Sequence, residues 1–238
     1  MNNETLRMFD TLDTWRNLPA YQLERRADIF FALFLPGVLE SFLGRPIRRQ
    51  IIPEFPVKRD LIWPDTPSNQ SLKVDYLALS EDGESAYLVE LKTDAASRRD
   101  QQDHYLHVAA DLGLTKLLEG YIKNLQNTSA HQKYFHLTNA LASLRLLQLP
   151  PEVQQFTYPK PKPGLRAQLR RITTGEVPQQ LKVVYVQPTG GGADGVIDFD
   201  FVATHLEAME SAFAARFALS LRRWRRPAGS EVPQRDGT

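Results

Sequence analysis

The order of hydrophobic and polar positions predicts a helix near the start of the chain, followed by an extended segment. Apolar residues recur at helical spacing over about residues 19–42, and Gly44 is a typical stop after them. Pro36 lies inside this pattern and is expected to kink or interrupt the helix. Residues 47–57 are rich in β-branched side chains but carry two prolines, which predicts a strand at the edge of a sheet.

The next part of the chain predicts a β-hairpin. Residues 72–79 and 86–93 are two apolar, strand-like segments, and a short polar stretch with Asp82-Gly83 separates them. Asp-Gly is a typical tight-turn dipeptide between antiparallel strands. Residues 58–71, which precede the hairpin, are rich in proline, serine and asparagine and predict a loop.

The second half of the chain predicts further helices around one more strand. Residues 181–188 form a nearly continuous apolar run, typical of a strand buried on both faces. A proline-rich stretch over about residues 150–180 indicates a surface insertion, and the residues from 227 to 238 are expected to be disordered. The helical patterns cover about residues 95–125, a second segment ending near 147, and about 201–226.

Composition limits the class of protein. A chain of 238 residues suffices for one α/β domain, predicted here over residues 1–226 with its core at about 19–188. The absence of cysteine excludes disulfides, thiolate metal sites and a cysteine nucleophile. We expect a cytoplasmic protein with no membrane association, because no signal peptide or long apolar run is present. The net charge of +1 does not by itself indicate nucleic-acid binding.

The predicted hairpin carries the candidate chemistry. Side chains alternate along a strand, so Glu90 and Lys92 fall on one face. Asp75, in the preceding strand, is in a position to converge with Glu90 across the hairpin. Two carboxylates that close repel each other unless a cation lies between them, and Mg²⁺ or Mn²⁺ suits such oxygen ligands. Lys92 would then orient a water and stabilise charge during attack on a phosphodiester.

This arrangement resembles the PD-(D/E)XK nuclease superfamily. Asp75 followed by Glu90-Leu91-Lys92 is similar to its D…(D/E)xK signature, although Val74 replaces the proline of the family name. The resemblance implies an α/β fold of the restriction-endonuclease-like type: an αβββαβ core with a central mixed sheet flanked by helices, plus a C-terminal helix. It also implies that the metal is bound by Asp75, Glu90 and the carbonyl oxygen of Leu91.

Two further elements extend the resemblance. Gln101 and Tyr105 are similar to the QxxxY element of the RecB-like branch, and with Ser97 they share one face of the predicted helix. Many family members also carry an acidic residue on the first helix that faces the site. Glu24, Asp28 and Glu40 are candidates for this role, and Glu24 is favoured. The predicted catalytic set is therefore Asp75, Glu90, Lys92, Gln101, Tyr105 and Glu24.

Simpler interpretations exist for each feature. An acid-x-lysine pattern is often a surface ion pair. The run at residues 221–226, LRRWRR, suits a phosphate-binding patch with Trp224 for base stacking, but cations also favour a helix C-terminus for electrostatic reasons. Arg98 and Arg99 allow the same two interpretations.

The sequence thus predicts a metal-dependent nuclease that hydrolyses DNA. The alternatives are a non-catalytic nucleic-acid-binding or protein-interaction module on the same fold, and a mobile-element nuclease that requires a partner. The amphipathic final helix suits a homodimer, and the near-neutral charge suits a partner protein that supplies affinity for nucleic acid.

Overall fold

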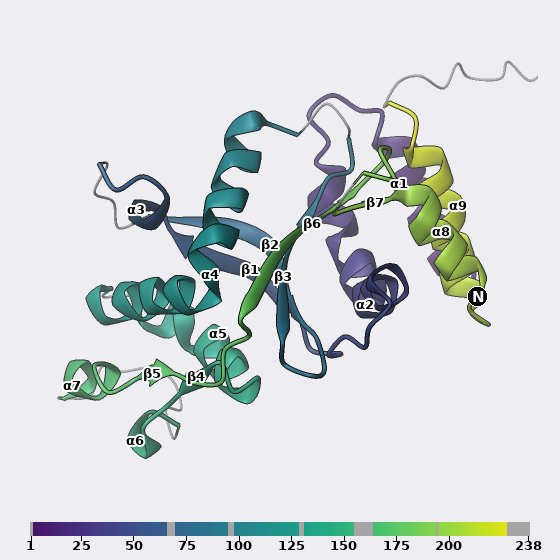
Figure 1. Cartoon of the computed structure of the whole chain (residues 1–238). Helices are drawn as coiled ribbons and strands as arrows, with labels where there is room; N and C mark the ends of the chain where they lie inside the picture. The colour runs from purple at the N-terminus through teal and green to yellow at the C-terminus, as the bar shows by residue number, and fades with distance from the viewer. Residues whose placement is uncertain are drawn as a thin grey trace, which may run out of the picture. The chain divides into compact units, whose positions relative to one another are not determined.

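The chain has an α/β fold with a five-stranded mixed sheet and accompanying helices (Figure 1). This computed structural model describes residues 2–65, 70–94, 98–128, 131–154, 164–193 and 195–227. The sheet order is β1-β2-β3-β6-β7. The pairs β1–β2 and β2–β3 are antiparallel, whereas β6–β7 is parallel. The strands are β1 (Ile52–Lys58), β2 (Ser71–Leu79), β3 (Ser85–Leu91), β6 (Gln180–Gln187) and β7 (Val196–Asp198).

The chain folds into two compact units, and the strands β3 and β6 contribute residues to both. The first unit comprises Met1–Arg45, Glu90–Asp100 and Val184–Thr238, and the second comprises Pro46–Val89 and Gln101–Val183. The predicted single domain over residues 1–226 stays a prediction.

Aromatic side chains form the core of the first unit. Phe9 and Phe31 are buried, and each packs against buried Phe217, with ring centroids 5.9 and 5.2 Å apart. These ring contacts connect helices from both ends of the chain. In Figure 1 the helices lie together with β7. These helices are α1 (Asn3–Trp15), α2 (Leu23–Leu43), α8 (Phe199–Glu207) and α9 (Ala212–Trp224).

Several helix predictions in the first unit need correction. The helix α2 continues through Pro36, which is buried within it, so the expected interruption does not occur. It ends as predicted at Gly44, whose φ of 65° a residue without a Cβ adopts readily. The predicted final helix is two helices, because the side chain of Ser211 accepts a hydrogen bond from Ala214 N (3.2 Å) and starts α9 anew. Neither α1 nor β7 was predicted.

The second unit contains the predicted hairpin. Tyr76 lies opposite Val89, and Leu77 opposite Leu88, in the antiparallel register of β2 and β3. Gly83 adopts a φ of 75° in the turn, and β1 occupies the edge position predicted from its prolines. The hairpin and the edge strand are therefore confirmed.

Helices and short strands complete the second unit. The predicted long helix is α4, which begins at Asp100 and is broken at Gly113 (φ 78°, ψ 157°). The proline-rich insertion lies partly outside the described residues, and its described parts form short elements. Residues 228–238 also lie outside them. These elements are α3 (Arg59–Ile62), α4 (Asp100–Asn127), α5 (His131–Ser143), β4 (Leu147–Gln148), α6 (Pro151–Gln154), α7 (Leu165–Leu169) and β5 (Thr173–Thr174).

Long apolar helices are absent from the described part of the chain. No helix there has the length and hydrophobicity needed to cross a bilayer.

Candidate functional site

The C-terminal end of β3 places two charged side chains in a buried environment. Every residue of β3 from Ser85 to Leu91 is buried, and Glu90 is only 2% exposed. Lys92 directly follows the strand and is 5% exposed. Its backbone N–H donates to the carbonyl oxygen of Val186 on β6 (2.8 Å), so the neighbouring strand fixes the position of Lys92.

The ammonium group of Lys92 is held by three oxygen atoms of the first unit. It donates to Glu90 Oε1 (2.6 Å) and to the carbonyl oxygen of Leu91 (3.0 Å). Glu24 Oε2, from the first turn of α2, lies 3.6 Å away. A buried charge is costly unless it is paired and hydrogen-bonded, and these contacts compensate Lys92 and Glu90 mutually.

Of the three acids proposed from the sequence, Glu24 lies 3.6 Å from Lys92 Nζ. The other two acids also interact with described residues. Asp28 accepts a hydrogen bond from Ile29 N (2.6 Å), and the charge of Glu40 acts on His205. The assignment of a catalytic role to Glu24 stays a prediction.

The atoms predicted to bind a metal in the first unit already surround a cation. The Glu90 carboxylate and the Leu91 carbonyl both contact the ammonium group, and both are hard oxygen donors of the kind that Mg²⁺ and Mn²⁺ prefer. The donor set therefore fits the expected ion. Within the described residues, no group of three His, Cys, Asp or Glu side chains could hold a metal. The predicted ligand set has two carboxylates and one carbonyl, so this result does not test it.

The remaining predicted residues belong to the second unit. Asp75 is half-buried on β2, and its predicted convergence with Glu90 stays a prediction. Tyr105 on α4 is buried, and its hydroxyl group donates to the carbonyl oxygen of Lys73 (3.1 Å), two residues before Asp75. Gln101 is exposed in the first turn of α4, and Ser97 lies outside the described residues.

A cavity of about 410 Å³ in the first unit was not predicted from the sequence. Glu24 lines it, and so do Thr93 and Asp94, which directly follow Lys92. Glu24 therefore belongs both to the cavity wall and to the surroundings of the Lys92 ammonium group. Its remaining lining residues come from the segment after α1, the start of α2, the residue after β6 and the end of α9: Arg16, Leu18, Tyr21, Gln22, Leu23, Arg25, Pro188, Trp224, Arg225, Arg226 and Pro227.

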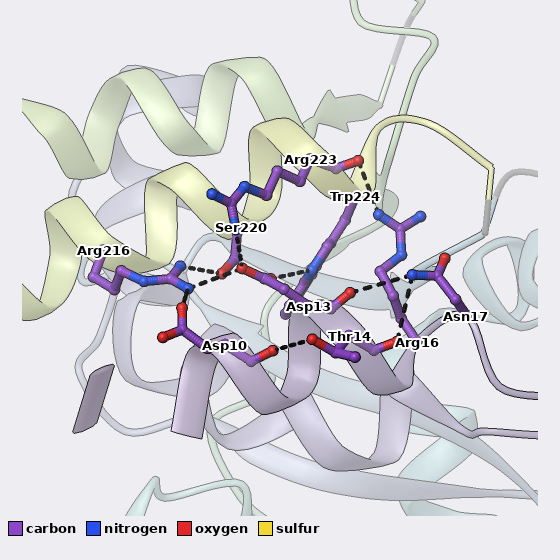
Figure 2. A network of polar contacts seen from close by, with 9 residues as sticks. All are labelled: Asp10, Asp13, Thr14, Arg16, Asn17, Arg216, Ser220, Arg223 and Trp224. Carbon is purple, nitrogen blue, oxygen red and sulfur yellow. Dashed lines mark hydrogen bonds and ion pairs between the residues drawn. The ribbon is translucent and has the colours of Figure 1, made fainter. Parts of the chain in front are cut away.

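The basic run at the end of α9 is mostly engaged within the protein. Arg223 pairs with Asp13 (2.9 Å), and Arg225 pairs with Asp200 (2.6 Å). Trp224 is 1% exposed, and its Nε1–H donates to Asp13 (2.8 Å), as Figure 2 shows. The interpretation of Trp224 as a stacking surface for bases is therefore wrong, because its ring is covered by the protein.

Comparisons with known proteins identify no relative. No protein-family model matches the chain, and neither a curated protein nor a solved structure matches it significantly.

Proposed function

We propose that the chain is a divalent-metal-dependent nuclease of the PD-(D/E)XK type, acting on DNA. The observation that carries the proposal is the buried cluster at the end of β3. There the Lys92 ammonium contacts Glu90 Oε1 (2.6 Å) and the carbonyl oxygen of Leu91 (3.0 Å). Charged groups that are buried and paired in this way are often found at sites where charge changes during a reaction.

In this proposal Asp75 and Glu90 provide carboxylate ligands from adjacent strands. Tyr76 and Val89 are opposite each other in the register of β2 and β3. Along the chain, Asp75 precedes Tyr76 on β2 and Glu90 follows Val89 on β3. When bound, Mg²⁺ or Mn²⁺ would lower the pKa of a water and neutralise phosphate charge.

The protein's own groups have separate roles in the proposed reaction. Lys92 donates hydrogen bonds to an oxygen atom of the phosphate or to the attacking water, once it leaves the carbonyl oxygen of Leu91. Glu24, 3.6 Å from Lys92 Nζ, holds the ammonium group at this end of the strand. Tyr105 is a positioning residue, because its hydroxyl group anchors the backbone of β2 at Lys73.

Metal binding is the first test. A metal that binds only the folded state stabilises it by about 2.7 kcal/mol at a hundredfold excess over Kd. For a chain of this size we expect Mn²⁺ to raise the melting temperature by about 5–10 °C. Asp75→Ala should lose this response, whereas Glu119→Gln, an exposed carboxylate of the same unit, should keep it. An unchanged melting temperature in the wild type would reject the metal site.

Plasmid nicking in Mg²⁺ or Mn²⁺ tests the chemistry. Lys92→Ala should abolish nicking, and Lys116→Ala, which removes an exposed lysine on α4, should not. Nicking that persists in Lys92→Ala would assign the activity to another site or to a contaminant.

One observation favours a second function, a non-catalytic nucleic-acid-binding or protein-interaction module. Lys92 Nζ lies 2.6 Å from Glu90 Oε1, and a buried ion pair of this kind can serve the specificity of folding instead of a reaction. In that case Mn²⁺ leaves the melting temperature unchanged and no nicking occurs, although binding of DNA or of a partner protein is measurable.

A further inference from the structure

The cavity of the first unit has the size and position of a ligand site. Its volume of about 410 Å³ lies within the range of pockets that bind small molecules. Glu24 lines the cavity and also approaches Lys92 to 3.6 Å. A ligand in the cavity would therefore lie next to the groups proposed to cleave a phosphodiester.

Positive charge dominates the lining of this cavity. Four arginines face two carboxylates there, those of Glu24 and Asp94. Arg16 donates to the carbonyl oxygen of Arg223 (2.8 Å), as Figure 2 shows. It also donates to the carbonyl oxygen of Arg226, so Arg16 ties the end of α9 to the segment after α1.

Two of the four arginines are available to a ligand. Arg25 and Arg226 are exposed, and no ion pair or hydrogen bond within the described part of the chain occupies either guanidinium group. Arg225, in contrast, pairs with Asp200 (2.6 Å). The planar guanidinium group matches the geometry of a phosphate and binds it through two hydrogen bonds.

An aromatic side chain completes the site. Tyr21 lines the cavity and is half-buried, and its ring packs edge-on against Trp15 at 6.1 Å. Aromatic side chains beside cationic ones are a usual combination in sites for single nucleotides or single strands, because every base has a face that stacks.

We propose that this cavity binds one nucleotide unit of a nucleic-acid strand, with Arg25 and Arg226 on its phosphate and Tyr21 against its base or sugar. The proposal deepens the proposed nuclease function and rests on it for the identity of the strand. Binding itself needs no metal, because the arginines supply the positive charge.

Nuclear magnetic resonance of the tryptophan indole N–H groups tests the proposal. The full chain is titrated in EDTA with thymidine 5′-monophosphate or thymidine. The monophosphate should shift the Trp224 and Trp15 signals saturably and bind about tenfold or more tightly than thymidine, since hydrogen bonds to charged groups are strong. Trp63, which belongs to the second unit and does not line the cavity, is an internal reference. Inorganic phosphate should compete.

Variants assign the binding to the two arginines. Arg25→Gln combined with Arg226→Gln should remove the advantage of the monophosphate over thymidine. Arg26→Gln is the matched control, because Arg26 is an exposed neighbour on α2 that does not line the cavity. The proposal is overturned if the monophosphate leaves the Trp224 and Trp15 signals unshifted, if thymidine binds as tightly, or if the double variant keeps the difference.

The outcome is independent of the metal experiments. Binding of the monophosphate without a response to Mn²⁺ would keep the nucleotide site and reject the nuclease. A melting-temperature response to Mn²⁺ together with nicking, but without binding of the monophosphate, would keep the nuclease and reject the nucleotide site.

Discussion

Replacing Lys92 by methionine should destabilise the protein strongly, because the substitution leaves Glu90 buried without its cation. Lys92 and Glu90 are 5% and 2% exposed, and their charged atoms are 2.6 Å apart. Removing one partner of such a buried pair costs about 3–5 kcal/mol. For a chain of this length, the loss corresponds to a decrease in melting temperature of roughly 6–20 °C.

A double-mutant cycle separates the pair from its surroundings. Urea denaturation in EDTA would be measured for Lys92→Met, Glu90→Leu and the double variant. Because an apolar pair of similar volume often replaces a buried ion pair without loss, the double variant should be more stable than the sum of the single losses predicts. The reasoning is refuted if the stability losses of the two single variants simply add up to that of the double variant. It is also refuted if Lys92→Met loses less than about 1 kcal/mol, since either result means that water screens the pair.

Three further predictions concern other parts of the structure. Asp13→Ala should lower the free energy of unfolding by about 3–5 kcal/mol in urea denaturation, because the buried guanidinium group of Arg216 loses one of its carboxylate partners (Figure 2). A loss no larger than that of the exposed control Asp10→Ala would contradict this. Burial lowers the pKa of His205 below its usual 6.5, so the unfolded chain binds more protons and stability should decrease as the pH falls below about 6.5. His205→Gln should reduce this decrease between pH 7 and pH 5, and an identical pH dependence in both proteins would argue against it. Tyr105→Phe should cost about 0.5–1.5 kcal/mol of stability by removing one hydrogen bond to β2, and unchanged stability would mean that the bond contributes nothing.

Local signals in the sequence were sufficient for the hairpin. Asp82 accepts a hydrogen bond from Glu84 N (2.9 Å), and Gly83 adopts the positive φ that the turn requires. Both effects act between residues close in sequence, so the sequence alone could predict them. Ser211 is an equally local signal for the start of α9. The apolar pattern continues on both sides of it over residues 201–226, so a single helix was predicted there.

Tertiary contacts decided what the sequence could not predict. The helix α1 has few apolar residues, and its buried Phe9 packs against Phe30 of α2 and Phe217 of the distant α9. Pro36 is tolerated inside α2, where the burial of neighbouring side chains such as Leu35 favours the helix over an interruption. The cavity of the first unit likewise combines residues from four separate stretches of the chain: 16–25, 93–94, 188 and 224–227.

The candidate site was predicted only in its local part. The two-residue spacing of Glu90 and Lys92 already implied that both side chains could meet near the end of β3. The contact of Lys92 with Leu91 depends on the conformation of a long, flexible side chain, and the approach of Glu24 depends on the packing of α2. Neither is fixed by spacing along the sequence.

The physical cost of the Glu90–Lys92 pair is itself an argument for chemistry at this end of β3. Two apolar side chains in the same place would be at least as stable, because the desolvation of two charges offsets most of their attraction. The rest of β3 follows this rule, since its buried residues other than Glu90 are apolar apart from Ser85. Most of β3 is apolar, and the buried acid Glu90 and the buried base Lys92 at its end are better explained by the proposed chemistry than by stability.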